Sequence, residues 1–201
     1  MTAAVFLDRD GVLNAKAPDG RYVTGWGGFR MLPGVDAALR ELRRRAPGVR
    51  LIVLTNQRGV ALGEVGEAAL ADIHARMARV LSDAGAALDG IYVCPHAERA
   101  CDCRKPATGL FRQARADFPD IEPPRSAMIG DSLDDLEAGH RAGCAVYLVG
   151  ELPRRRVVVA GAAVRHIPIA GEASSLEALV RTYAVVEGSG AEGLAGSAGV
   201  R

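Results

Sequence analysis

The sequence has no excess of charge of either sign. It holds 25 Lys and Arg against 24 Asp and Glu, for a formal net charge of +1. Because the positive and negative charges nearly cancel, the chain has no long-range electrostatic field that would attract it to nucleic acid or to an acidic membrane surface. We therefore expect neither nucleic acid nor a membrane among its partners.

Long hydrophobic runs are also missing. Asp8 comes before any apolar stretch of signal-peptide length could form, and the run from Val157 to Val164 is too short to span a bilayer. There are only four cysteines, three of them between residues 94 and 103, and nothing in this pattern indicates secretion. Together these absences predict a cytoplasmic protein.

The order of apolar segments predicts the fold class. The chain has no internal repeat, and its 201 residues suit one domain that needs no covalent staples. Strand-like runs near 3–7, 49–54, 91–93, 126–129 and 144–149 alternate with amphipathic, helix-like stretches at 35–45, 65–84, 107–117 and 133–141. This alternation predicts an α/β fold with a doubly wound parallel sheet.

The C-terminal part gives weaker signals. We expect the domain to cover residues 1–186 and to finish with a short strand near 164–167 and a helix near 175–186. Arg154, Arg155 and Arg156 are interpreted as a solvated basic turn. The stretch 187–201 is rich in Gly, Ala and Ser, which predicts a disordered tail.

Two carboxylates follow the first predicted strand. The run Val5–Leu7 is followed by Asp8, Arg9, Asp10 and Gly11, so both acids would lie at the carboxyl edge of a parallel sheet, where such sheets place their sites. Acids this close repel each other unless a cation lies between them. Magnesium is the natural candidate because it takes hard oxygen ligands. A solvated, Asp-rich loop is the alternative.

Three further polar motifs follow strand-like or loop segments. A Thr hydroxyl and the backbone N–H groups of a turn are suited to hold phosphate oxygens, adjacent cations suit phosphate, and a second acidic cluster suits a metal. Pro106 would start the next helix at its first position. Taken singly, each motif is more often a turn or a helix cap than a functional site. The motifs are Thr55-Asn56-Gln57-Arg58, Arg104-Lys105-Pro106 and Gly130-Asp131-Ser132-Leu133-Asp134-Asp135.

Three cysteines and a histidine form a fifth group. Cys94 and His96 are followed after a short interval by Cys101 and Cys103, which supplies a complete Cys3His set for tetrahedral zinc. The alternatives are a disulfide or unligated thiols, and the first is disfavoured in a protein without signs of secretion. With no open position left for substrate, such a zinc would be structural. It would fix the loop that carries Arg104 and Lys105.

In this order the four polar motifs resemble those of the haloacid dehalogenase superfamily of phosphohydrolases. The resemblance implies that Asp8 is the nucleophile and Asp10 the general acid and base. It also implies that Thr55 and Lys105 clamp the phosphate, and that Asp131 binds magnesium together with the two acids of the first motif. No large cap domain would fit between the first two motifs.

The resemblance also covers the fourth motif and the loops. It implies that Asp135 orients Lys105. Within the superfamily, the segments around Asp8, Thr55, the cysteine loop and Arg104 to Leu110 look like the D-glycero-D-manno-heptose 1,7-bisphosphate 7-phosphatase family, over nearly the whole chain to about residue 150. Membership would imply a monomeric enzyme of nucleotide-activated heptose biosynthesis, with a small sugar bisphosphate as substrate.

Selectivity leaves alternatives open. Histidinol-phosphate phosphatases share the metal motifs and the zinc loop, but usually lack the glycine found here at position 109. The chain departs from the heptose family by carrying Arg58 where a small residue is common and Leu62 where an arginine is common. We expect Arg104, and less directly Arg58 and Asn56, to contact the substrate. The runner-up functions are a histidinol-phosphate phosphatase or another small sugar-phosphate phosphatase; a nucleic-acid 3'-phosphatase or a non-catalytic zinc module fits less well.

Overall fold

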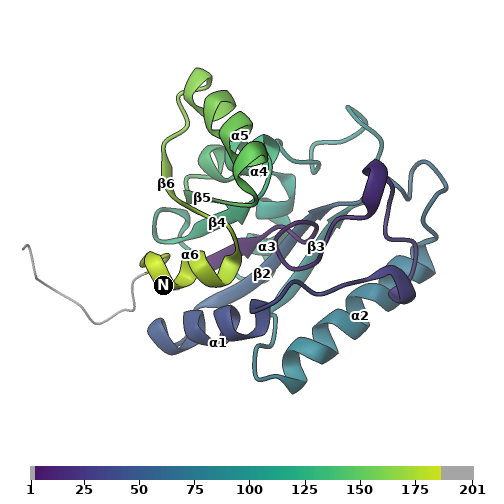
Figure 1. Cartoon of the computed structure of the whole chain (residues 1–201), viewed down its shortest axis with the longest axis horizontal. Helices are drawn as coiled ribbons and strands as arrows, with labels where there is room; N and C mark the ends of the chain where they lie inside the picture. The colour runs from purple at the N-terminus through teal and green to yellow at the C-terminus, as the bar shows by residue number, and fades with distance from the viewer. Residues whose placement is uncertain (1–2, 187–201) are drawn as a thin grey trace, which may run out of the picture.

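The computed structural model describes residues 3–186, in which six strands form one sheet (Figure 1). The strand order is β3-β2-β1-β4-β5-β6, and all neighbouring pairs are parallel. All four residues of the central strand β1 are buried, as its continuous apolar sequence predicts. The strands are β1 (Ala4–Leu7), β2 (Arg50–Asn56), β3 (Gly90–Cys94), β4 (Ala127–Gly130), β5 (Ala145–Val149) and β6 (Ile169–Ala173).

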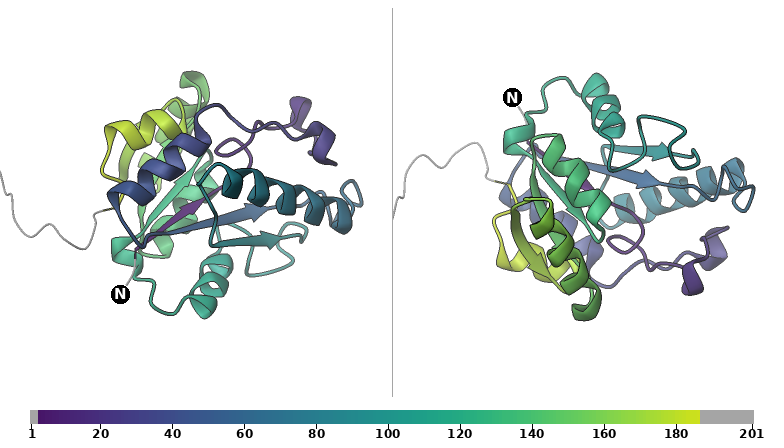
Figure 2. Two further views of the ribbon diagram at one scale, coloured as in Figure 1. Left: turned by 90° about the horizontal axis from the view of Figure 1, so that it is seen from below. Right: turned by 90° about the horizontal axis from the view of Figure 1, so that it is seen from above.

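Helices cover both faces of this sheet (Figures 1 and 2). On one face α1 (Val35–Arg45), α2 (Glu67–Asp83) and α6 (Leu176–Thr182) bury their apolar sides in one core cluster. On the other face α3 (Gly109–Asp117), α4 (Leu133–Arg141) and α5 (Leu152–Val164) contribute to a second cluster. The predicted doubly wound parallel sheet is therefore confirmed.

The topology places a crevice at one edge of the sheet. The strand order reverses beside β1, which pairs with β2 on one side and β4 on the other. Parallel sheets bind ligands at the carboxyl ends of the strands at such a reversal. The connection from β1 to α1 runs along this edge and contains only two short 3-10 turns, Pro18–Gly20 and Trp26–Gly28. The described part of the chain shows no large cap domain, as expected.

Several sequence expectations need correction. Residues 152–164 form helix α5 rather than a basic turn followed by a strand near 164–167, and the sixth strand lies at 169–173. Pro106 does not open α3, which begins at Gly109. The last helix is shorter than expected. The predicted tail, 187–201, lies outside the described residues.

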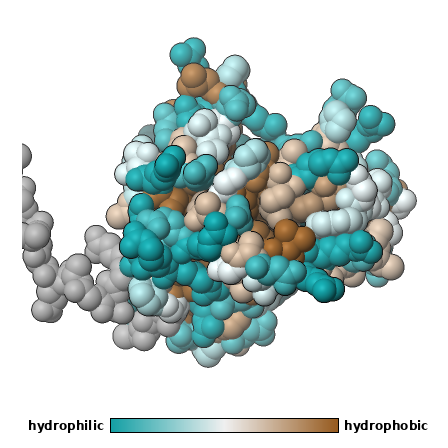
Figure 3. All heavy atoms as spheres, turned by 60° about the horizontal axis from the view of Figure 1, so that its bottom comes forward, coloured by the Kyte–Doolittle hydropathy of each residue, from teal (hydrophilic) through white to brown (hydrophobic). Residues whose placement is uncertain are grey.

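One face of the molecule is mostly polar. Hydrophilic side chains predominate on the face shown in Figure 3, and hydrophobic ones gather near its middle. None of the helices within residues 3–186 combines the length and the apolar composition needed to cross a membrane.

Candidate active site

The motifs meet at the carboxyl edge of the sheet because each follows or ends a neighbouring strand. Asp8 comes directly after β1, Thr55 is the second-to-last residue of β2, and Asp131 follows β4. The backbone N–H of Asp8 donates to the carbonyl of Ile129 at 3.0 Å, which extends the pairing of β1 and β4 into the site. The side chains of all three residues are buried.

Lys105 lies at the centre of this group. Its ammonium is 2.8 Å from Asp8 Oδ1 and 2.6 Å from Asp135 Oδ1, and it donates to the carbonyl of Leu54 at 2.6 Å. Only 1% of the lysine side chain is exposed. Burial alone would lower the pKa of Lys105, but the charges of Asp135 and Asp8 outweigh burial and raise that pKa. The lysine is therefore held as a cation between two carboxylates.

Asp135 is positioned by the start of α4. It is the third residue of the helix, and with Ser132 it forms a capping box, in which each side chain hydrogen-bonds the other residue's backbone N–H. The Ser132 N–H donates to Asp135 Oδ2 at 3.1 Å, which leaves Oδ1 for Lys105. The contact with Lys105 agrees with the expected orienting role.

Three carboxylates form a compact group that could hold a cation. One oxygen from each of Asp8, Asp131 and Asp135 lies within 4.8 Å of the others. Burial raises the pKa of Asp8 to about 7; the charge of Asp135 adds to this shift and Lys105 opposes it. Burial likewise raises the pKa of Asp131, against the charge of Lys16. Buried, crowded oxygen ligands of this kind fit magnesium, which would offset their repulsion.

The Asp10 residue, expected to help bind magnesium, has its carboxylate held by neighbouring donors. It accepts hydrogen bonds from Arg9 and Asn14 at 2.9 Å and from Gln57 at 2.8 Å, and it is not part of the carboxylate group. Burial favours a higher pKa for Asp10, but the charge of Arg9 and the three hydrogen bonds outweigh burial and lower it. The donors around Asp10 therefore favour its ionised form.

The end of β2 connects the first and third motifs. Thr55 Oγ1 accepts a hydrogen bond from Gln57 Nε2 at 2.8 Å, and the same nitrogen reaches Asp10. Asn56 uses both ends of its amide on the backbone of Lys105: its Nδ2 donates to the carbonyl at 3.1 Å and its Oδ1 accepts from the N–H at 3.0 Å. Asn56 therefore positions the lysine loop.

The two candidate arginines lie in different environments. Arg58 forms an ion pair with Glu98, and its side chain is 39% exposed. Arg104 is partly buried, and its Nη1 atom has no hydrogen-bond partner among residues 3–186. A buried donor without a partner is costly, so a ligand oxygen is a natural acceptor for Arg104.

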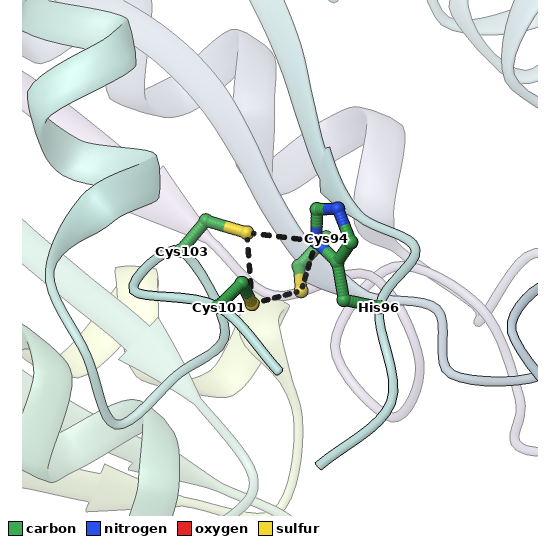
Figure 4. Close-up of side chains that lie close together, drawn as sticks. All are labelled: Cys94, His96, Cys101 and Cys103. Atoms are coloured by element: carbon green, nitrogen blue, oxygen red, sulfur yellow. Dashed lines mark hydrogen bonds between the residues drawn. The ribbon is translucent and has the colours of Figure 1, made fainter. Parts of the chain in front are cut away.

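The predicted zinc ligands converge (Figure 4). The Sγ atoms of Cys94 and Cys101 are 3.5 Å apart, and Cys103 Sγ lies 3.2 Å from Cys101 Sγ and 3.3 Å from His96 Nδ1. The cysteines are free thiols rather than a disulfide. Zinc–sulfur bonds of about 2.3 Å in a tetrahedral site require ligand atoms at about this spacing. The four residues therefore form a group that could hold a metal.

One of the three thiols is shifted toward the form that binds zinc, while burial raises the pKa values of Cys94 and Cys103. Burial favours a higher pKa for Cys101, but hydrogen bonds from Cys103 and from backbone N–H groups lower it to about 6. A thiolate is the form that binds zinc. The cluster lies directly before Lys105 in the chain. Its loop packs closely on the start of α3, because a Cβ at Gly109 would lie 2.5 Å from the carbonyl oxygen of Asp102.

Sequence reasoning missed several residues at the site. The buried Arg9 links Asp10 to His74 of α2, with 2.9 Å between Arg9 Nη1 and His74 Nε2. Lys16 contacts both oxygens of Asp131, at 2.8 and 2.6 Å. Arg154, at the start of α5, lines a cavity beside Asp10. The sequence held a signal for Arg154, because it follows the strand-like run 145–149 by five residues. A helix that follows a parallel strand begins at the carboxyl edge of the sheet, where the site lies.

Comparisons with known proteins agree with this geometry. A family described as HAD-hydrolase-like matches residues 102–157. A D-glycero-alpha-D-manno-heptose-1,7-bisphosphate 7-phosphatase of Mycobacterium tuberculosis (strain CDC 1551 / Oshkosh) is 42% identical over 142 residues, which is 70% of this chain and 73% of the relative. A D-glycero-beta-D-manno-heptose-1,7-bisphosphate 7-phosphatase of Escherichia coli (strain K12) is 41% identical over 67% of this chain and 72% of its own length.

A solved structure supports the same relationship. The D,D-heptose 1,7-bisphosphate phosphatase of B. bronchiseptica, complexed with magnesium and phosphate, aligns with a TM-score of 0.77 and 32% identity. The alignment covers 90% of this chain and 97% of that one. Both the sequence relatives and the shared sheet therefore lead to one conclusion: the chain belongs to the D-glycero-D-manno-heptose 1,7-bisphosphate 7-phosphatase family, phosphoric monoester hydrolases of the haloacid dehalogenase superfamily.

Proposed function

We propose that this protein removes the 7-phosphate of D-glycero-D-manno-heptose 1,7-bisphosphate, as a monomer in the cytoplasm, in nucleotide-activated heptose biosynthesis. The main support is the buried arrangement of Asp8, Lys105 and Asp135, which holds a carboxylate nucleophile beside a fixed cation. The names of the relatives supply the substrate class. Since relatives named for either anomer have nearly the same identity, the comparisons favour neither anomer.

In the first step Asp8 is the nucleophile. One carboxylate oxygen attacks phosphorus, an aspartyl phosphate forms, and the bond between phosphorus and the sugar oxygen breaks. Lys105 and the Thr55 hydroxyl would hold the other phosphate oxygens, and Arg104 would donate its free Nη1 to the substrate. Asp10 takes up a proton before this step and gives it to the leaving alkoxide.

In the second step Asp10 acts as a base. It accepts a proton from water, whose oxygen attacks the phosphorus of the aspartyl phosphate and releases inorganic phosphate and free Asp8. The donors around Asp10 keep this carboxylate ionised, which suits the base role. Arg9 and Gln57 hold it beside the site by hydrogen bonds at 2.9 and 2.8 Å.

Two metals fit the donor sets. Asp8 and Asp131 would hold magnesium, which supplies positive charge to a phosphate dianion approached by an anion. Asp10, two residues after Asp8 in the chain, would join them as the third ligand. Cys94, His96, Cys101 and Cys103 would hold zinc with no open position, so its role would be to fix the loop that carries Lys105.

A comparison of substrates tests the proposal. We expect kcat/KM for at least one anomer of the heptose 1,7-bisphosphate to exceed the values for histidinol phosphate and fructose 1,6-bisphosphate by about tenfold or more. Phosphate release and the identity of the remaining monophosphate would both be measured, because hydrolysis must occur at position 7. A preference for histidinol phosphate, or release of the 1-phosphate, would contradict the proposal.

A further inference from the structure

A buried arginine connects Asp10 to helix α2. Arg9 lies between the two acids of the first motif, and only 1% of its side chain is exposed. Its Nη2 atom is 2.9 Å from each of the two carboxylate oxygens of Asp10. Its Nη1 atom is 2.9 Å from Nε2 of His74. One end of the guanidinium therefore lies against the carboxylate, and the other lies against a residue of α2.

This contact defines the state of the His74 ring. A guanidinium stays protonated and can only donate hydrogen bonds, so Nε2 of His74 must accept. A neutral imidazole with its proton on Nδ1 offers the lone pair that this requires. Burial and the charge of Arg9 lower the pKa of His74 to about 4, against an opposing effect of the charge of Asp10. The ring is therefore neutral at pH 7.

The place of His74 on α2 suits a fixed acceptor. Ile73, the residue before it, and Met77, three residues after it, are fully buried and belong to the core cluster on this face of the sheet. The helix is 17 residues long, and these contacts anchor it near its middle. Arg9, by contrast, lies in the loop after β1. The imidazole therefore gives the arginine a partner on a rigid element.

The Arg9 side chain depends on this partner. Its Nε atom is already buried without a hydrogen-bond partner among residues 3–186. Removing the His74 acceptor would leave a second part of the buried cation unpaired, which is costly. The side chain would then shift toward another acceptor or toward water. Because the guanidinium is planar and rigid, the Nη2 atom that contacts Asp10 would move with it.

We propose that His74 is a positioning residue for the acid and base step: by accepting a hydrogen bond from one end of Arg9, it keeps the other end against the carboxylate of Asp10. This inference rests on the proposed function, in which Asp10 gives a proton to the leaving oxygen as the bond between that oxygen and phosphorus breaks. A misplaced carboxylate transfers this proton less well. Loss of His74 should therefore matter most for leaving groups that are strong bases.

The test compares two leaving groups without a sugar. The quantity measured is the ratio of kcat/KM for phenyl phosphate to kcat/KM for 4-nitrophenyl phosphate, because phenolate is the stronger base. Hydrolysis of the aspartyl phosphate follows release of the phenol and does not enter kcat/KM. We expect His74→Leu to lower the ratio about tenfold. His74→Gln should keep most of it, because its amide oxygen can accept from Arg9. An equal loss on both substrates, or an unchanged ratio, would overturn the proposal.

His140→Leu is the matched control. It makes the same substitution at an exposed histidine in the last turn of α4, so the ratio should stay at the wild-type value. A double-mutant cycle tests the route of the effect. Arg9→Met should lower the ratio, and adding His74→Leu should lower it no further, because His74 acts through Arg9. A further fall in the double variant would contradict this route.

Nitrogen NMR of the ¹⁵N-labelled wild type tests the contact directly. At pH 7 we expect a neutral His74 ring with its proton on Nδ1, and His74→Gln identifies the signal by its loss. A proton on Nε2 would overturn the proposal even if His74→Leu did not fold. None of these measurements depends on the natural substrate. A wild type that prefers histidinol phosphate but shows the expected ratios and ring state would contradict the proposed function alone.

Discussion

Replacing Lys105 with methionine tests whether the buried ion group organises the site. Methionine keeps most of the volume and removes the charge. Asp8 and Asp135, whose side chains are 12% and 2% exposed, would then face each other without the ammonium that lies 2.8 and 2.6 Å from them. Removing one partner of a buried ion pair costs about 3–5 kcal/mol, so we expect Lys105→Met to lower the free energy of unfolding by this amount.

The assay is urea unfolding followed by circular dichroism at pH 8 without added magnesium. This pH lies above the raised pKa of Asp8, about 7, so the Asp8 carboxylate is charged in the wild type. Lys16→Met is the control. Lys16 also contacts a carboxylate of the group, but its side chain is 34% exposed, so water can replace it and we expect a loss of about 1 kcal/mol or less.

A double variant separates stability from chemistry. Adding Asp135→Asn to Lys105→Met removes one of the two opposed charges, and we expect it to restore about 1 kcal/mol or more of stability. Phosphate release should remain lost, because no cation then faces the reacting phosphate. Wild-type stability in Lys105→Met, or no recovery in the double variant, would refute the reasoning.

Three other predictions follow from the site. Asp8→Asn removes the nucleophile while keeping its shape, and phosphate release should fall by about a thousandfold or more; near-normal turnover would contradict the aspartyl-phosphate route. Cys103→Ser should lower the zinc content measured by elemental analysis from about one per chain and reduce activity through the displaced Lys105 loop; a zinc-free, fully active wild type would contradict this role. Burial and the charge of Arg9 lower the pKa of His74 to about 4, so the unfolded chain binds more protons below pH 6.5. Stability should therefore fall between pH 6.5 and 4, by at most about 1.4 kcal/mol per pH unit from this group, and His74→Gln should flatten that part of the profile.

The local apolar pattern was enough to predict five of the six strands and the residues that meet at their carboxyl edge. Runs such as Val5–Leu7 and Leu51–Leu54 are apolar throughout, which is the local signature of strands buried on both faces. In a parallel sheet their carboxyl ends share an edge, so Asp8, Thr55 and Asp131 were expected there together. The cysteine group was also predictable, because its four ligands are near neighbours in the chain and need little tertiary information.

The ends of the fold were less predictable. The β-branched valines of α5 favour a strand. In the structure, however, Val157 and Val164 are 73% and 79% exposed. The buried residues are Val158 and Ala162, whose spacing of four residues is that of a helix. Strand β6 contains Gly171 and Glu172 and pairs only with β5 at the sheet edge, so its sequence carries little hydrophobic signal. Tertiary packing decided both elements.

The directions in which the polar side chains point could not be predicted from the sequence. Asp10 was predictable as a site residue, but the sequence did not show that Arg9, Asn14 and Gln57 hold its carboxylate. Arg154 belongs to a run of three arginines that are indistinguishable in sequence. The turn of α5 brings this one to the cavity while its neighbour pairs with Glu172. Side-chain direction depends on contacts between segments far apart in the chain, and a local pattern does not encode them.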